Sequence, residues 1–113
     1  MSTSHLLNWN EFEKVDMRVG RIMEVRAFPE AIRPAYRLLI DFGSLGTKKS
    51  SAQITNYKPK DLIGRQVVAV VNFPPKQIGP FVSEVLVLGA IVDSGEVKLL
   101  MPDADCELGS KVS

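Results

Sequence analysis

The stretch MRVGRIMEVRA, residues 17–27, alternates apolar and charged side chains along most of its length. The apolar side chains occupy odd positions: Met17, Val19, Met23, Val25 and Ala27. Arg21 and Ile22 are exceptions to a period-2 pattern that predicts a β-strand. Gly20, inside so long a strand, favours a bend or bulge, which lets one strand contribute to two sides of a small barrel. This strand therefore decides the expected fold.

Four further strands and one short helix are expected downstream, in the order strand, strand, helix, strand, strand. Their segments are YRLLIDF (36–42), KKSSAQIT (48–55), YKPKDLIG (57–64), RQVVAVVNF (65–73) and SEVLVLGAIV (83–92). In the helical segment, Pro59 suits the first helical position and Gly64 suits the end. Three strands, a helix and two strands form the element order of the all-β OB-fold, a five-stranded Greek-key barrel. The pattern alone leaves other small barrels open.

The length and composition predict a single domain. The chain has 113 residues, of which 45% are hydrophobic, enough for one modest core. We expect this domain to cover residues 1–113. A helical extension at about 8–15, capped by Asn8 or Asn10, should precede the barrel, and a hairpin and tail at about 91–113 should follow it. The proline-containing segments 28–36 and 74–82 are predicted to be loops.

Charge and cysteine content restrict the functional classes. Fourteen Lys and Arg against thirteen Asp and Glu leave a net charge of +1, so any nucleic-acid site must be a local patch. The single cysteine, Cys106, predicts neither an intramolecular disulfide nor a zinc cluster. Residues 1–10 lack a basic segment followed by a long apolar run, and no stretch approaches membrane-spanning length. We therefore expect a cytoplasmic protein without membrane insertion.

The sequence offers no catalytic constellation. The only histidine, His5, lies near the N-terminus without a neighbour to orient it, and Cys106 has no histidine near it in sequence. Asp103, Asp105 and Glu107 lack the glycine and distant glutamate of a calcium loop. The glycines form no phosphate-cradling motif. We predict a protein that is not an enzyme and that needs no metal or cofactor.

The third strand segment, KKSSAQIT, points to binding. Its outward set of Lys49, Ser51 and Gln53 cannot belong to a core, so it must face something polar. On an OB-fold the binding face is built from strands two and three and two flanking loops. The candidate nucleic-acid contacts on that face are Arg33, Lys49, Ser51, Gln53, Asn72, Lys76 and Ser83. The alternative is that these are ordinary solvated residues of an open barrel side.

The segment that joins strands four and five is unusually apolar for a loop. Phe73, Pro75, Ile78 and Phe81 are the candidate contacts for an unfolded peptide, and the prolines would stiffen the segment before it binds. The alternative is that Ile78 and Phe81 fold back over the end of the barrel or into a dimer contact.

Several separated motifs resemble the tRNA-binding-domain family: VDMRVGRI, PAYRLLIDFG, KSSAQIT, NYKPKDLIGRQVVAVVNFPPKQIG and SEVLVLGA. The similarity is greatest to a branch of bacterial chaperones linked to protein secretion. It implies an OB-fold, a homodimer and one of two functions. The first is a non-enzymatic chaperone that binds unfolded precursor proteins for export, with the secretion motor ATPase as a further partner. The second is a module that binds tRNA, if only weakly.

The resemblance also bears on individual residues. Four residues match the residue pattern of the family, and the resemblance implies that they contact nucleic acid: Ser51, Asn72, Lys76 and Ser83. Gln77, where tRNA-binding relatives carry denser basic charge, and Glu84, which adds a carboxylate, both weaken the RNA interpretation.

A dimer is also expected from the residues themselves. Trp9 and Phe12 in the N-terminal turn, with Leu100 and Met101 near the tail, are apolar residues in segments with little core of their own. We expect them to need a partner surface.

Overall fold

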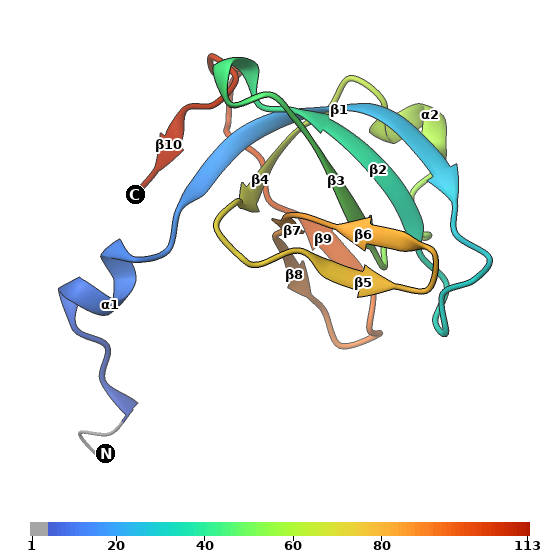
Figure 1. The fold of residues 1–113 in the computed structure, drawn as a ribbon, viewed down its shortest axis with the longest axis horizontal. Helices are drawn as coiled ribbons and strands as arrows, with labels where there is room; N and C mark the ends of the chain where they lie inside the picture. Colours follow the sequence, from blue (N-terminus) through green and yellow to red (C-terminus); the bar gives the residue numbers. More distant parts are fainter. Residues whose placement is uncertain (1–4) are drawn as a thin grey trace.

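The computed structural model describes residues 5–113, and its framework is a small antiparallel barrel (Figure 1). The elements are α1 (Trp9–Glu13), β1 (Met17–Ala27), β2 (Tyr36–Asp41), the 3₁₀ turn η2 (Gly43–Leu45), β3 (Thr47–Ala52), α2 (Pro59–Leu62), β4 (Gln66–Val70), β5 (Lys76–Ile78), β6 (Phe81–Ser83), β7 (Leu86–Val87), β8 (Gly89–Ile91), β9 (Val97–Leu99) and β10 (Lys111–Val112). The strand order is β3-β2-β1-β4-β7, with β10 paired to β1. The predicted OB-fold and the helix between its third and fourth strands are confirmed.

Strand β1 supports both sides of this barrel. Its residues Met17–Arg21 pair with β4, whereas Arg21–Ala27 pair with β2. The register with β2 shifts between Ile22 and Glu24, so the bulge falls there and not at Gly20, for which a bend or bulge is predicted. Gly20 is required instead by the close packing of core side chains against its backbone. A Cβ at position 20 would lie 2.6 Å from side-chain atoms of both Ile40 and Phe42, because the core packs directly against its backbone.

The core fills the barrel with side chains from β1, β2, β4, α2 and the segments next to them. It comprises Ile22, Leu38, Ile40, Phe42, Ile54, Leu62, Val67, Ala69 and Val85. Every residue of β4 is buried, in agreement with its continuous apolar sequence. Leu62 of α2 is fully buried, which makes this short helix the plug of one barrel end.

Two predictions about the second half of the chain were wrong. The segment 74–82 is not a loop, because β5 and β6 form a hairpin within it. The expected fifth strand breaks at Leu88 into β7, which pairs with β4, and β8, which turns away to pair with β9. The side chain of Val97 lies against Gly89 where a Cβ would otherwise be, so the β8–β9 hairpin depends on that glycine.

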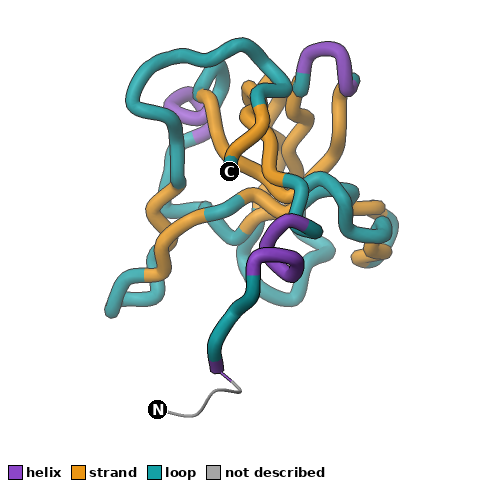
Figure 2. The backbone as a smooth tube through the Cα atoms, turned by 90° about the vertical axis from the view of Figure 1, so that its left-hand side faces the viewer, coloured by secondary structure: helices purple, strands orange, loops and turns teal. Residues whose placement is uncertain are grey.

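The N-terminal segment projects from the barrel in both views (Figures 1 and 2). Its helix α1 begins at a capping box: the side chain of Asn8 accepts a hydrogen bond from the Glu11 N–H at 2.9 Å, and Glu11 accepts from the Asn8 N–H at 3.4 Å. Asn8, not Asn10, is therefore the cap. Residues 1–4 of the predicted domain lie outside the described residues.

The C-terminal tail is fixed by a buried amide. The Gln66 side chain donates to the Cys106 carbonyl at 2.8 Å and accepts from the Cys106 N–H at 2.9 Å. Further along, the Gly109 N–H donates to the Val19 carbonyl at 2.8 Å and the Val19 N–H donates to the Ser110 carbonyl at 2.9 Å, and β10 pairs with the start of β1. No helix between residues 5 and 113 is long and apolar enough to cross a membrane.

We expect Gly20→Ala to lower the free energy of unfolding by about 1–3 kcal/mol, because the new methyl group would force Ile40 and Phe42 out of their packed positions. Urea unfolding followed by the fluorescence of Trp9 or by circular dichroism measures this change. A substitution that left the unfolding midpoint unchanged would contradict the close packing at this position.

Candidate binding site

The β5–β6 hairpin is fastened to strand β3 by a short set of hydrogen bonds. The Glu84 N–H donates to the Lys49 carbonyl at 2.8 Å, and the Lys49 N–H donates to the Glu84 carboxylate at 2.9 Å. Two residues along, the Ser51 N–H donates to the Ser83 hydroxyl at 3.2 Å. Because β3 is an edge of the main sheet, these bonds close the barrel and hold the hairpin beside it.

The hairpin is also anchored by aromatic packing. Phe81 is 9% exposed, and its ring meets that of Phe28 edge-on, with 5.4 Å between centroids. Ile78 packs against the same small cluster, which includes Ala35. Phe81 and Ile78 therefore pack back onto the barrel, as the alternative held. Each still reaches a surface hollow in part, Phe81 the one beside Lys49 and Ile78 the one beside Lys76, so peptide contact at these two residues stays a prediction.

Four of the seven predicted nucleic-acid contacts line one depression, here called the polar hollow. Its volume is about 790 Å³. Its lining residues are Glu30, Ala31, Ile32, Arg33, Ala35, Ser51, Gln53, Lys76, Gln77, Ile78 and Gly79. Arg33 and Lys76 supply two cations, with Glu30 as the opposing charge. The loop between β1 and β2, strand β3 and the hairpin thus meet here, as the OB-fold prediction required.

The other three predicted contacts lie elsewhere. Ser83 pairs with Lys76 across the hairpin, but its hydroxyl is engaged with β3. The Asn72 side chain accepts from the Asp16 N–H at 3.0 Å and donates to the Lys14 carbonyl at 2.7 Å. Asn72 therefore ties the segment before β1 to the end of β4. Lys49 lines a separate hollow described below.

A second depression, here called the apolar hollow, adjoins the polar one through Lys76. Its volume is about 260 Å³, and its lining residues are Phe73, Pro74, Lys76, Ser83, Glu84, Val85 and Leu86. Phe73 and Leu86 are 54% and 47% exposed. Pro75, also predicted as a peptide contact, is exposed nearby but does not line the hollow. Phe73 is thus the member of the predicted peptide set that is both exposed and part of the apolar hollow.

The predicted dimer residues divide into two pairs, in which Trp9, Leu100 and Met101 are exposed and Phe12 is half-buried. Trp9 is 75% exposed on the projecting α1, and its ring packs on Phe12 with 6.1 Å between centroids. Leu100 and Met101, which follow β9, are 45% and 52% exposed. Between residues 5 and 113, no group of three or more His, Cys, Asp and Glu side chains could hold a metal ion.

A family model of the tRNA binding domain matches residues 17–111, so the chain belongs to the tRNA-binding-domain family. Within it, two solved structures of chaperones are closely similar. The CsaA chaperone protein of Picrophilus torridus is 59% identical with a TM-score of 0.91, over 96% of this chain and 100% of that one. The chaperone CsaA of Bacillus anthracis is 52% identical with a TM-score of 0.91, over 96% of this chain and 99% of that one.

Sequence similarity also extends to parts of larger proteins. The methionine–tRNA ligase of Methanocaldococcus jannaschii is 36% identical over 100 residues, which are 88% of this chain and 15% of the ligase. That of Nanoarchaeum equitans is 39% identical over 107 residues, which are 95% of this chain and 14% of the ligase. The chain therefore spans only about a seventh of these ligases.

We expect Glu84→Leu to lower the free energy of unfolding by about 1–2 kcal/mol, because the Lys49 N–H loses its acceptor and the hairpin loses a tether. Glu84→Gln keeps an acceptor oxygen and should cost less. Denaturant unfolding and amide exchange at Lys49 measure both effects. Glu96→Leu is the matched control, since its ion pair with Lys98 is exposed and contributes little. Equal losses in Glu84→Leu and Glu96→Leu would contradict the tether.

Proposed function

We propose that this protein is a non-enzymatic, homodimeric chaperone that binds unfolded segments of precursor proteins before their export. The observation that carries the proposal is the apolar hollow beside a fastened hairpin, in a chain similar along 96% of its length to CsaA chaperones. An unfolded segment would insert an apolar side chain between Phe73 and Leu86. We place this activity in the cytoplasm.

The expected binding free energy is that of a weak, reversible complex. Burial of one large apolar side chain contributes about 1.5–3 kcal/mol, and the hairpin is fixed before binding, so little ordering entropy is lost. The sequence has no phosphate-cradling glycine motif to couple release to nucleotide hydrolysis. Release would therefore occur by competition or by transfer to the secretion motor ATPase, the partner that the family resemblance implies.

The second candidate function is tRNA binding, which the polar hollow favours. Arg33 and Lys76 could neutralise backbone phosphates, and Ser51 and Gln53 could donate hydrogen bonds to phosphate or base oxygens. The presence of Glu30 in the same hollow and a net charge of +1 argue for a modest affinity.

One experiment distinguishes the two functions. It measures fluorescence anisotropy with a labelled unfolded precursor segment and with labelled tRNA, each at low and near-physiological salt. We expect the affinity for the precursor segment to be nearly independent of salt. The double variant Phe73→Ser with Leu86→Ser should weaken this affinity about tenfold or more, because apolar burial is lost. Ile91→Ser is the matched control, since Ile91 is 79% exposed on β8 and lines neither hollow. Unchanged affinity in the double variant would contradict the placement in the apolar hollow.

The measurement with labelled tRNA tests the second function. Phosphate contacts lose affinity steeply as salt rises, so binding through the polar hollow should fall with salt and with Lys76→Met. Retained tRNA binding at near-physiological salt, without precursor binding, would reject the chaperone and establish the second function.

The proposed dimer buries exposed apolar residues of α1 and the tail. A hollow of about 550 Å³ is lined by Leu7, Asn8, Trp9, Phe12 and Ser113. Its apolar surface would suit contact with a second copy of the chain.

We expect light scattering to give the mass of two chains, and Trp9→Ser with Phe12→Ser to shift the mass towards that of one. A single-chain mass for the unmodified protein would contradict the dimer.

A further inference from the structure

The outer face of strands β1, β2 and β3 carries an unusual row of charges. Arg26 of β1 lies directly opposite Arg37 of β2, and Glu24 lies opposite Leu39, which in turn faces Lys49 of β3. Like charges directly opposite each other in neighbouring strands destabilise a sheet. Two facing arginines with a lysine close by therefore call for a compensating negative charge.

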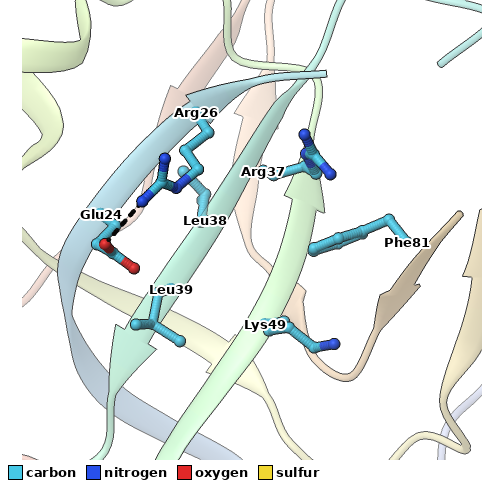
Figure 3. Close-up of a pocket in the computed structure, with 7 residues that line it drawn as sticks. All are labelled: Glu24, Arg26, Arg37, Leu38, Leu39, Lys49 and Phe81. Atoms are coloured by element: carbon cyan, nitrogen blue, oxygen red, sulfur yellow. Dashed lines mark hydrogen bonds and ion pairs between the residues drawn. The ribbon is translucent and has the colours of Figure 1, made fainter. Parts of the chain in front are cut away.

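A depression on this face, here called the cationic hollow, collects these side chains. Its volume is about 190 Å³, and its lining residues are Glu24, Arg26, Arg37, Leu38, Leu39, Lys49 and Phe81. Figure 3 shows the Phe81 ring between Arg37 and Lys49, with the Glu24 and Arg26 pair on the far side of β2. The hollow thus has an apolar floor and a cationic rim.

The one carboxylate in the hollow does not satisfy the arginine at its centre. Glu24 is engaged with Arg26 at 3.2 Å. Arg37 Nε is buried and has no hydrogen-bond partner among residues 5–113. A buried donor without an acceptor carries a desolvation cost that a bound anion would remove.

Arg37 and Lys49, which form no ion pair within residues 5–113, both lie against aromatic rings. The Arg37 guanidinium lies 5.3 Å from the ring centroid of Phe28 and 5.7 Å from that of Phe81. The Lys49 ammonium lies 5.5 Å from the Phe81 centroid. These contacts fix the charges before any ligand arrives, which lowers the entropy cost of binding.

We propose that the cationic hollow binds a carboxylate of the same unfolded polypeptide whose apolar side chain occupies the apolar hollow, an inference that rests on the proposed chaperone function. The two hollows are neighbours, since Lys49 lines one and its N–H is bonded to Glu84, which lines the other. A segment with an Asp or Glu a few residues from a large apolar residue can reach both.

The surrounding charges favour an isolated carboxylate over a nucleic-acid strand. The fork of an arginine binds carboxylate and phosphate alike. A nucleic-acid strand, however, carries a charge at every residue, so phosphates that flank the hollow would approach Glu24 on one side and Glu84 on the other. A polypeptide with one acidic side chain can place its only negative charge between Arg37 and Lys49 and brings no further negative charge towards Glu24 or Glu84.

The test uses two labelled peptides that share one apolar sequence and differ only in a single Glu or Gln, with anisotropy measured on the intact protein. We expect the Glu peptide to bind about tenfold more tightly, because its carboxylate gains charge-assisted hydrogen bonds. Lys49→Met and Arg37→Met should abolish this difference, whereas Arg37→Lys should retain part of it. Lys60→Met removes a positive charge from α2, outside all three hollows, and should leave the difference unchanged.

A second readout follows Arg37 directly. The Arg37 Nε–Hε resonance, assigned from its absence in Arg37→Lys, should shift on addition of the Glu peptide and not of the Gln peptide. Lys49→Met removes the ammonium group of an exposed residue, so it tests the inference even if Arg37→Met does not fold.

The outcomes distinguish this inference from the function on which it rests. Equal binding of both peptides by the unmodified protein would overturn the carboxylate site and leave the chaperone function intact. Binding of neither peptide would overturn both. A shift of the Arg37 resonance by a single-stranded RNA oligonucleotide, with none from the Glu peptide, would assign the hollow to phosphate and overturn the inference.

Discussion

The contact between Lys49 and Glu84 is the interaction on which the binding surface depends. Strand β3 ends the main sheet, and without a partner its backbone N–H and carbonyl groups would face solvent as an open edge. Glu84 supplies both the donor and the acceptor that Lys49 needs, the first from its backbone and the second from its carboxylate. Closure of the barrel at this point also fixes where the β5–β6 hairpin lies.

The position of the hairpin then determines the three hollows around it. Lys76 lines both the polar and the apolar hollow, and Phe81 lines the cationic one from the other end of the hairpin. Apolar, cationic and hydrogen-bonding groups are thereby presented by a single short element. An unfolded polypeptide displays the same mixture along its chain, whereas a nucleic acid displays a repeated negative charge. The chemistry of the surface therefore agrees better with a polypeptide ligand.

The local sequence pattern predicted those secondary-structure elements that local interactions determine. The period of residues 17–27 predicted β1, and Pro59 marked the first position of α2. The β5–β6 hairpin escaped prediction because its three-residue strands are too short for a period, and its prolines and Gly79 resemble loop signals. The fifth strand breaks because β8 pairs with β9 in a hairpin instead of continuing the pairing of β7 with β4. The roles of Asn72, Arg37 and Glu84 depend on groups distant in sequence, so a contact residue and a tether look the same in the sequence.

Hydrogen–deuterium exchange with and without an unfolded precursor segment tests the central claim most directly, which is that ligands bind around the fastened hairpin. We predict slower exchange in residues 47–53 and 73–86, with little change in the β8–β9 hairpin. Protection confined to α1 or to the β8–β9 hairpin, with residues 73–86 exchanging as in the free protein, would contradict the claim.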